Sequence, residues 1–243
     1  MGKEVTLTVK RGAEAARESL DVLATPISYD AETTLRYDWW CKRNAEEVAK
    51  ISGGKIGYLH IRSMGEESLV DFERDLYAAA DGKEGLLIDV RNNGGGWTAD
   101  RVLASIMVQP HAYTVPRGGS VHTDAYPRDR LYIQRYTKPV NMLCNEKSFS
   151  NAEIISHAFK TLKRGNLCGQ QTYGGVISTD AFNLLDGTLV RIPFRGWFLP
   201  DGTDMENHGA MPDVVTIQTP EDEAAGIDRQ LKEATEDLMK RIK

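Results

Sequence analysis

Two short segments of the chain combine residue types that could stabilise and attack a carbonyl group. The first is Asn92-Asn93-Gly94-Gly95-Gly96, which lies between an apolar strand pattern and a helical pattern. Three glycines let the backbone adopt positive φ angles and approach a ligand closely. Backbone N–H groups at such a turn, near the positive end of a helix dipole, can hold a developing oxyanion. A tight structural turn is the alternative interpretation, and a glycine triplet alone favours it.

The second segment, residues 148–153, places Ser150 directly between another strand and another helix. A hydroxyl at a helix N-terminus can face a substrate carbonyl together with its own N–H and the one that follows. Ser150 and Glu153 also have the spacing of a capping box, in which the serine only satisfies helix N–H groups. Taken alone, this spacing favours capping over catalysis.

An alternation of strands and helices begins at about residue 55 and predicts one large α/β domain. A strand, a sharp loop and a helix follow one another at both candidate segments. The predicted strands cover residues 55–61, 85–90 and 139–145, and the helices cover 68–80, 98–108 and a run from about 151. Further short strands are predicted at 166–169, 188–194, 195–199 and 213–217, and a charged closing helix at 221–243.

The N-terminal part of the chain has a different pattern. Residues 5–11 alternate apolar and polar side chains as a strand does, with no earlier segment to pair with. A short charged helix is expected at 13–19, followed by an extended segment and a helical run that ends near Lys50. We expect residues 13–54 to form a connector.

Composition and charge exclude several classes of protein. The 243 residues are 41% hydrophobic and 27% charged, as in ordinary globular proteins. No apolar run approaches the roughly 18 residues that cross a bilayer, so a membrane span is excluded. The formal net charge is −5 with both signs interspersed, so the chain lacks the basic surface that nucleic-acid binding requires.

Cysteine and histidine spacing predicts neither a disulfide framework nor a metal site. Cys41, Cys144 and Cys168 are odd in number and widely spaced, so we expect reduced thiols. No grouping of His, Cys, Asp and Glu has the spacing of metal ligands, and we expect no metal and no other cofactor. The start of the chain lacks the apolar stretch of a signal peptide, so the expected location is the cytoplasm.

Several longer segments also carry information through their order and spacing over residues 55–218. They are LLIDVRNNGGG, MLCNEKSFSNAEIISHAFK, LCGQQTYGGVIST, LLDGTLVRIPF and MENHGAMPDV. Together they resemble the catalytic domain of the tail-specific and tricorn serine peptidases, and within these the tricorn branch. A match of this extent is far more specific than either short motif, and it favours catalysis over capping at Ser150.

The resemblance implies a crotonase-like (ClpP-like) α/β fold of repeated ββα units, with Ser150 as the nucleophile. It implies an oxyanion hole made by the N–H groups of Asn151 and of a glycine in the 94–96 triplet, which we assign to Gly95. Glu206 matches the glutamate that completes the charge network around the catalytic histidine of the tricorn branch. The implied substrate is a peptide.

The resemblance also implies domain boundaries and an assembly. Residues 5–11 resemble the end of a PDZ-type domain, which precedes the catalytic domain in these peptidases. We therefore expect a PDZ-like remnant at 1–12, a connector at 13–54 and a tricorn-type catalytic domain at 55–243. The full-length protein is expected to be a homo-oligomer, and the resemblance implies a hexamer.

The chain lacks the residue that one branch of the family uses as the general base for its serine. The tail-specific branch uses a lysine downstream of the serine, but the corresponding residues 172–176 are Thr-Tyr-Gly-Gly-Val. The tricorn branch shares this Gly-Gly pair and uses a histidine from a helical subdomain that precedes the PDZ-type insert. Because a serine hydroxyl needs a base within hydrogen-bond reach, we expect the catalytic histidine to come from a segment outside this chain.

The histidines of the chain are the internal alternative for that base. His208 lies in the expected active-site loop and is the first candidate. His60 falls in an apolar strand and His157 inside a helix, where a structural role is expected. His111 and His122 lie at a variable-looking segment.

The sequence thus predicts a serine peptidase that hydrolyses short or unfolded peptides through an acyl-enzyme at Ser150. A non-catalytic peptide- or small-ligand-binding module of the same fold is the alternative, and the presence of Ser150, Gly95 and Glu206 argues against it. A crotonase-type acyl-CoA enzyme would share the fold, but the chain has no basic cluster suited to CoA phosphates.

Overall fold

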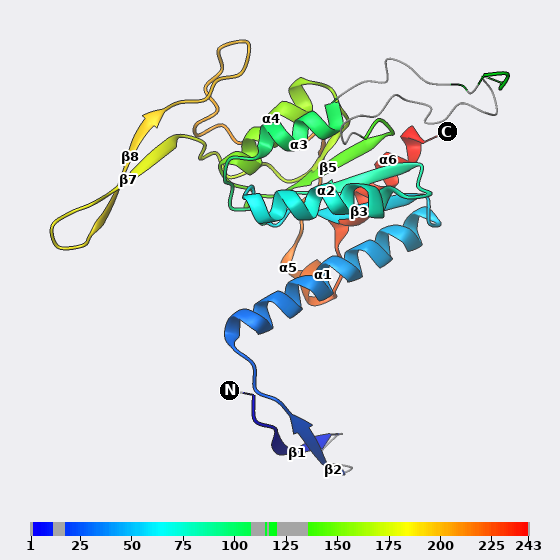
Figure 1. Cartoon of the computed structure of the whole chain (residues 1–243), viewed down its shortest axis with the longest axis vertical. Helices are drawn as coiled ribbons and strands as arrows, with labels where there is room; N and C mark the ends of the chain where they lie inside the picture. Colours follow the sequence, from blue (N-terminus) through cyan, green and yellow to red (C-terminus); the bar gives the residue numbers. More distant parts are fainter. Residues whose placement is uncertain (1, 12–17, 108–114, 116, 121–135, 243) are drawn as a thin grey trace. The chain divides into compact units, whose positions relative to one another are not determined.

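The computed structural model describes residues 2–11, 18–107, 115, 117–120 and 136–242. The chain divides into two compact units, Met1–Arg43 and Asn44–Lys243. Helix α1 (Tyr29–Ser52) contains the boundary between them. The larger unit holds the main sheet and both candidate segments (Figure 1).

The smaller unit contains an antiparallel pair of strands. Strand β1 (Val5–Arg11) pairs with β2 (Glu18–Ala24), with Val9 opposite Leu20. The strand predicted over residues 5–11 is confirmed. No earlier segment pairs with it, and its partner is instead the strand that follows it in the chain.

The helix predicted over residues 13–19 is wrong where the structure describes it, because Glu18 and Ser19 belong to β2. Pairing with β1 and the alternation of apolar and polar residues along β2 outweigh the helix propensity of the charged run. The earlier part of that prediction lies outside the described residues. The helical run predicted to end near Lys50 is confirmed by α1.

The larger unit is built, within the described residues, on a five-stranded parallel sheet with the order β3-β4-β5-β6-β9. Its strands are β3 (Ile56–His60), β4 (Gly85–Asp89), β5 (Val140–Cys144), β6 (Leu167–Gly169) and β9 (Val214–Val215). Each lies inside a segment predicted as a strand. The four buried strands, β3 to β6, appear in sequence as apolar runs because helices cover both of their faces. The predicted α/β class is therefore confirmed.

Helices cover both faces of this sheet (Figure 1). They are α2 (Glu66–Ala80), α3 (Ala99–Met107) and α4 (Asn151–Thr161) on one face and α6 (Arg229–Arg241) on the other. Successive side chains of a strand point to opposite faces. Leu86 and Ile88 of β4 accordingly pack in the core beneath the first three helices, whereas Leu87 packs with α6. One short strand thus joins two apolar cores.

A second, antiparallel pair of strands also belongs to the larger unit. β7 (Ser178–Asn183) pairs with β8 (Leu189–Arg195), and most side chains of both strands are exposed. The sequence predicts β8 but not β7, because β7 is mostly polar and its conformation depends on pairing with β8. The strand predicted over residues 195–199 is wrong, since after β8 only Phe198 forms an isolated bridge, to Asp204.

The helix predicted over residues 221–243 is interrupted. Helix α5 (Pro220–Ala224) ends before Gly226, whose φ of 69° is a left-handed conformation that glycine adopts without strain. Helix α6 begins after Asp228, whose side chain accepts the Leu231 N–H at 2.8 Å. Across the described part of the chain, no helix is both long and apolar enough to cross a membrane.

Candidate active site

The two candidate segments form adjacent loops at one edge of the main sheet. Strands β4 and β5 are parallel neighbours with Asp89 opposite Leu143, so the loops that follow their carboxyl ends emerge side by side. A backbone hydrogen bond of 2.9 Å from Phe149 N to Asn93 O joins these loops directly. The sheet topology therefore brings the glycine triplet to Ser150.

Ser150 has a backbone conformation that serine rarely adopts. Its φ is 56° and its ψ is −116°, and it occupies the N-cap of α4. Such an outlier costs about 1–3 kcal/mol and is found mainly at functional sites. In a strand–turn–helix unit, a strained serine exposes its hydroxyl above the sheet. Ser150 is half-buried, and within the described residues its hydroxyl has no hydrogen bond to a histidine.

Glu153 holds this conformation in place. Its side chain is fully buried, and Oε1 accepts the N–H groups of Ser150 at 3.0 Å and Gly175 at 2.8 Å. Its Oε2 accepts the Thr172 hydroxyl at 2.7 Å and the Gly174 N–H. The Glu153 N–H donates to the Ser150 carbonyl oxygen at 2.9 Å. The Glu153 side chain thus caps the Ser150 N–H and also anchors a neighbouring loop, whereas among the described residues the Ser150 hydroxyl makes no cap hydrogen bond.

Glu206 anchors the continuation of that neighbouring loop. Its Oε2 accepts the N–H groups of Val176 at 2.7 Å and Ile177 at 3.0 Å. These amides directly follow the ones that Glu153 binds. Within the described residues no hydrogen bond joins Glu206 to Ser150, and the connection between them runs through this loop and Glu153.

Gly95 packs directly against Ser150. A Cβ atom at Gly95 would lie 2.7 Å from the Ser150 Cβ and 2.9 Å from the Asn151 N, so only glycine fits. The φ of Gly95 is 88°, which also favours glycine. The structure therefore brings Gly95, Ser150 and Asn151 together at one point.

The backbone N–H groups around this point differ in their availability. Gly95 N donates to Asn93 Oδ1 at 2.9 Å, so it is engaged within its own loop. In the part of the chain that the structure describes, the N–H groups of Gly94, Gly96 and Asn151 have no hydrogen-bond acceptor. Unpaired N–H groups beside a serine at a helix N-terminus can stabilise an oxyanion.

The Asn151 side chain has a separate role. Its Oδ1 accepts the N–H of Ala99, the first residue of α3, at 2.9 Å. Asn151 is buried and caps α3 from α4. The position at which α3 begins is thereby fixed relative to Ser150.

Each described histidine contacts a backbone carbonyl group. These contacts are His60 Nε2 to Arg91 O at 2.8 Å, His157 Nε2 to His208 O at 3.1 Å and His208 Nδ1 to Glu206 O at 2.9 Å. Burial lowers the pKa of His60 and of His157 below the ordinary value, which favours neutral rings. His111 lies outside the described residues, and so does His122. No contact pairs His208 with Ser150 in the described part of the chain.

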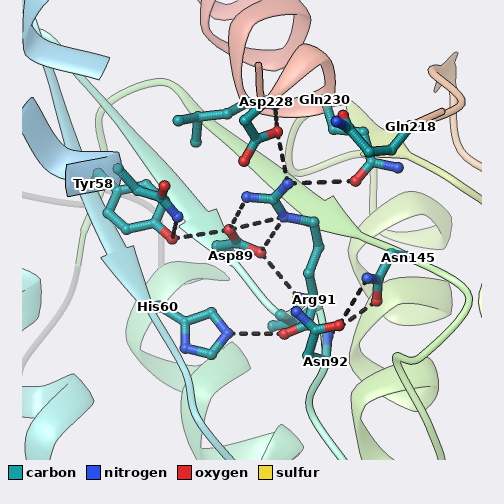
Figure 2. Close-up of polar contacts among 12 residues, drawn as sticks. Tyr58, His60, Asp89, Arg91, Asn92, Asn145, Gln218, Asp228 and Gln230 are labelled. Atoms are coloured by element: carbon teal, nitrogen blue, oxygen red, sulfur yellow. Dashed lines mark hydrogen bonds and ion pairs between the residues drawn. The ribbon is translucent and has the colours of Figure 1, made fainter. Parts of the chain in front are cut away.

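A buried ionic cluster holds the start of the glycine loop (Figure 2). Asp89 is 0% and Arg91 5% exposed, and Arg91 Nη2 lies 2.7 Å from Asp89 Oδ2. Burial alone would raise the pKa of Asp89, but the Arg91 guanidinium lowers it below its ordinary value, so the carboxylate is ionised. Arg91 Nη1 also contacts Asp228 Oδ1, at the N-cap of α6, at 2.9 Å. The residue before Asn92 is thus tied to the helix on the far face of the sheet.

The residues that support the site are less evident in the sequence than the site itself. Glu153 has the spacing of a helix cap, and its complete burial depends on tertiary packing. Asn93 resembles a turn residue, yet it is 0% exposed and its Nδ2 donates to Ile61 O at 2.8 Å. The usable signal was the glutamate three residues after Ser150, because a carboxylate there can bind N–H groups outside its own helix.

Comparison with known proteins finds one family over most of the chain. The model of Peptidase family S41 matches residues 55–216. Tricorn protease homolog 1 of Streptomyces coelicolor is 37% identical over 235 residues, which are 96% of this chain and 21% of that protein. The tricorn protease of Thermoplasma acidophilum is 34% identical over 216 residues, which are 88% of this chain and 19% of that protein.

Solved structures show the same relation in three dimensions. The crystal structure of the tricorn protease matches with a TM-score of 0.74 at 28% identity, over 97% of this chain and 22% of that chain. The photosystem II D1 C-terminal processing protease matches with a TM-score of 0.50 at 26% identity, over 66% of this chain and 42% of that one. The chain spans about a fifth of the length of the tricorn relatives that it matches.

Proposed function

Because the chain belongs to peptidase family S41, we propose that it is the catalytic part of a serine peptidase that cleaves short or unfolded peptides. The observation that carries this proposal is the contact among Gly95, Ser150 and Asn151. It places a strained serine beside N–H groups that have no other partner in the described chain. Helix capping alone gives no reason for a glycine loop to pack against the cap residue.

The proposed reaction forms an acyl-enzyme at Ser150. The Ser150 Oγ attacks the substrate carbonyl carbon while its proton passes to a base, and the carbonyl oxygen becomes an oxyanion. When the tetrahedral intermediate collapses, the C–N bond breaks and the amine leaves with the proton from the base. Water then attacks the ester carbonyl carbon while the base takes one of its protons. The ester C–O bond breaks, the base returns the proton to Ser150 Oγ, and the acid product leaves.

The proposed oxyanion donors are Asn151 N–H and an N–H of the glycine triplet. Gly95 serves as the second donor if substrate displaces its hydrogen bond to Asn93. The N–H groups of Gly94 and Gly96 are the alternatives, because neither has an acceptor in the described residues.

The proposed base is a histidine from a segment outside this chain, oriented by Glu206. Two observations support this part of the proposal. Residues 172–176 contain no lysine, and no histidine of the described chain hydrogen-bonds the Ser150 hydroxyl. Glu206 binds the loop of Val176 and Ile177 through Oε2, so Oε1 can accept a hydrogen bond from an incoming imidazole.

The proposal extends to the finer fold and to the assembly. The strand–loop–helix units β4–α3 and β5–α4 support a crotonase-like fold for residues 55–243. We assign residues 1–12 to a PDZ-like remnant and residues 13–54 to a connector. The longer protein is proposed to act on peptides in the cytoplasm as a hexamer, as its resemblance to the tricorn peptidases implies.

Labelling with a fluorophosphonate serine probe tests this function. The chain is treated alone and together with the histidine-bearing helical segment of a tricorn relative. We expect labelling at Ser150 only in the mixture, because an isolated hydroxyl is a poor nucleophile. Ser150→Ala should abolish the labelling, while Ser156→Ala, which alters a serine inside α4, should leave it intact.

The other outcomes of this experiment are also informative. Labelling of the chain alone would mean an internal base, with His208 the first candidate. No labelling of Ser150 in either sample would contradict the proposed nucleophile and favour the non-catalytic binding module.

A further inference from the structure

Three polar residues join two loops. One is the glycine loop, residues 92–96, and the other is the loop that leads to Ser150, residues 145–150, here called the nucleophile loop. We propose that Asn92, Asn145 and Ser148, here called the loop clamp, are positioning residues that set the distance between the oxyanion donors and Ser150. This inference deepens the proposed peptidase function and rests on it.

Asn92 and Asn145 form a reciprocal pair (Figure 2). Asn145 Oδ1 accepts the Asn92 N–H at 3.0 Å, and Asn145 Nδ2 donates to Asn92 Oδ1, also at 3.0 Å. Asn92 has a φ of 58°, a left-handed conformation that asparagine tolerates better than most residues. The pair therefore fixes both the backbone and the side chain of the residue that opens the glycine loop.

Ser148 adds a second connection between the loops. Its hydroxyl donates to Val90 O at 2.8 Å and accepts the Asn145 N–H at 3.1 Å. Asn145 Oδ1 also accepts the Lys147 N–H at 3.2 Å. Ser148 is 0% and Asn145 9% exposed, so water cannot easily replace these bonds.

The clamp lies close in sequence to both halves of the proposed site. Asn92 precedes Gly94 by two residues, and Ser148 precedes Ser150 by two residues. Sheet pairing ends at Asp89 opposite Leu143, so it does not reach the loops. Because a displacement of about 1 Å can slow an enzymatic reaction about a hundredfold, side chains that set this distance affect the rate directly.

Asn92 allows the clamp to be weakened without disturbing the fold, because it is exposed. Asn92→Gly keeps the left-handed backbone and the N–H but removes the acceptor for Asn145 Nδ2. Asn92→Asp restores an acceptor of the same shape. Asn145→Ala removes every side-chain bond of the pair and is the stronger but riskier variant.

Steady-state kinetics in the active enzyme measures the effect on catalysis. We expect Asn92→Gly to lower kcat about tenfold with KM within about twofold. Misplaced oxyanion donors stabilise the transition state less, whereas they affect binding of the substrate little. Asn92→Asp should recover most of kcat. The matched control is Asn166→Ala, which breaks a 2.8 Å hydrogen bond to Asp237. Asn166 lies at the amino end of β6, away from the loops at the carboxyl ends, so the change should leave kcat unchanged.

Hydrogen exchange followed by mass spectrometry tests the clamp without any activity. In Asn145→Ala we expect peptides covering residues 90–97 and 145–152 to exchange faster, with β4 unchanged. Exchange at the wild-type rate, or wild-type kcat in Asn92→Gly, would overturn the clamp. If the wild-type protein neither labels at Ser150 nor cleaves peptides, the proposed function fails, and hydrogen exchange still decides whether the clamp orders the loops.

Discussion

Glu153 is the residue on which the geometry around Ser150 depends most. It combines complete burial with acceptance of N–H groups from two loops, and one of these groups belongs to the proposed nucleophile itself. A carboxylate suits this position because it offers only acceptors to groups that are mostly donors.

Glu153→Gln tests this dependence. The amide replaces one acceptor oxygen with an NH2 group, so either Gly174 N–H or the pair Ser150 and Gly175 N–H would face a donor. We expect the free energy of unfolding, measured with urea, to fall by about 1–3 kcal/mol, the cost of leaving buried donors unpaired. Fluorophosphonate labelling of Ser150 should slow in parallel.

The control for this change is Glu146→Gln, which alters an exposed glutamate of the nucleophile loop. Its effect on the free energy of unfolding should stay within about 0.5 kcal/mol. An equally small effect for Glu153→Gln would mean that its hydrogen bonds do not hold the loop.

At the scale of elements, the glycine loop and the start of α4 are packed too closely to accept a side chain between them. Gly95→Ala would place its Cβ 2.7 Å from the Ser150 Cβ at a φ of 88°. We expect loss of Ser150 labelling and a lower melting temperature, because the two loops must move apart. Gly82→Ala is the matched control, since Gly82 has a φ of 65° and open space around it.

The two glycine variants separate the effect of backbone strain at positive φ from the effect of close packing against Ser150. Both introduce an alanine at positive φ, so both should lose some stability. Only Gly95→Ala should lose labelling. If Gly82→Ala and Gly95→Ala behave alike, the close packing at Ser150 does not matter for reactivity.

The elements that the sequence predicts well are those whose pattern is set by burial alone. The strands of the main sheet appear as apolar runs because helices cover both faces. Strand β7 is polar and exposed, so its pattern carries no such signal. The break between α5 and α6 rests on Gly226 and the Asp228 cap, which a run of charged residues conceals.

The candidate site shows the same division between sequence and tertiary structure. Ser150, Asn151 and Gly95 were predicted from motifs and resemblance, and the structure places them together. The engagement of the Gly95 N–H by Asn93 could not be predicted, because it depends on how a side chain folds back within its own loop.

At the scale of the whole molecule, the polar network of Figure 2 connects the start of the glycine loop to α6. Tyr58 donates to Asp89 Oδ2 at 2.9 Å, and Asn44 donates to the Tyr58 hydroxyl at 3.0 Å, so β3 and α1 join the same network. Global stability and the order of the glycine loop therefore depend on the same groups.

The pH dependence of stability should report on this network through His60. Burial lowers the pKa of His60 below the ordinary 6.5, so the unfolded chain binds a proton more readily than the folded one. The contribution of His60 to the free energy of unfolding is complete above pH 6.5. It is lost as the pH falls from there toward the lowered pKa of His60 in the folded protein. The slope for one proton is at most about 1.4 kcal/mol per pH unit.

His60→Gln removes the part of the pH dependence that comes from His60, because glutamine can still donate to the Arg91 carbonyl but does not titrate. Between pH 7 and pH 5.5, the free energy of unfolding should fall less in the variant than in the wild-type protein. Part of the fall should remain, since the pKa of His157 is lowered as well. Equal falls in both proteins would show that His60 is not a source of the dependence.

The burial of Asn93 also protects its side chain from deamidation. An asparagine followed by glycine, as Asn93 is by Gly94, deamidates readily when the next backbone nitrogen attacks the side-chain amide carbon. In the folded protein Asn93 is 0% exposed, with Nδ2 bound to Ile61 O and Oδ1 bound to Gly95 N, so the attack is blocked. Unfolding removes that protection, and a chain deamidated there cannot rebuild the same glycine loop. The rate of deamidation at Asn93 should therefore follow the fraction of time that the chain spends unfolded.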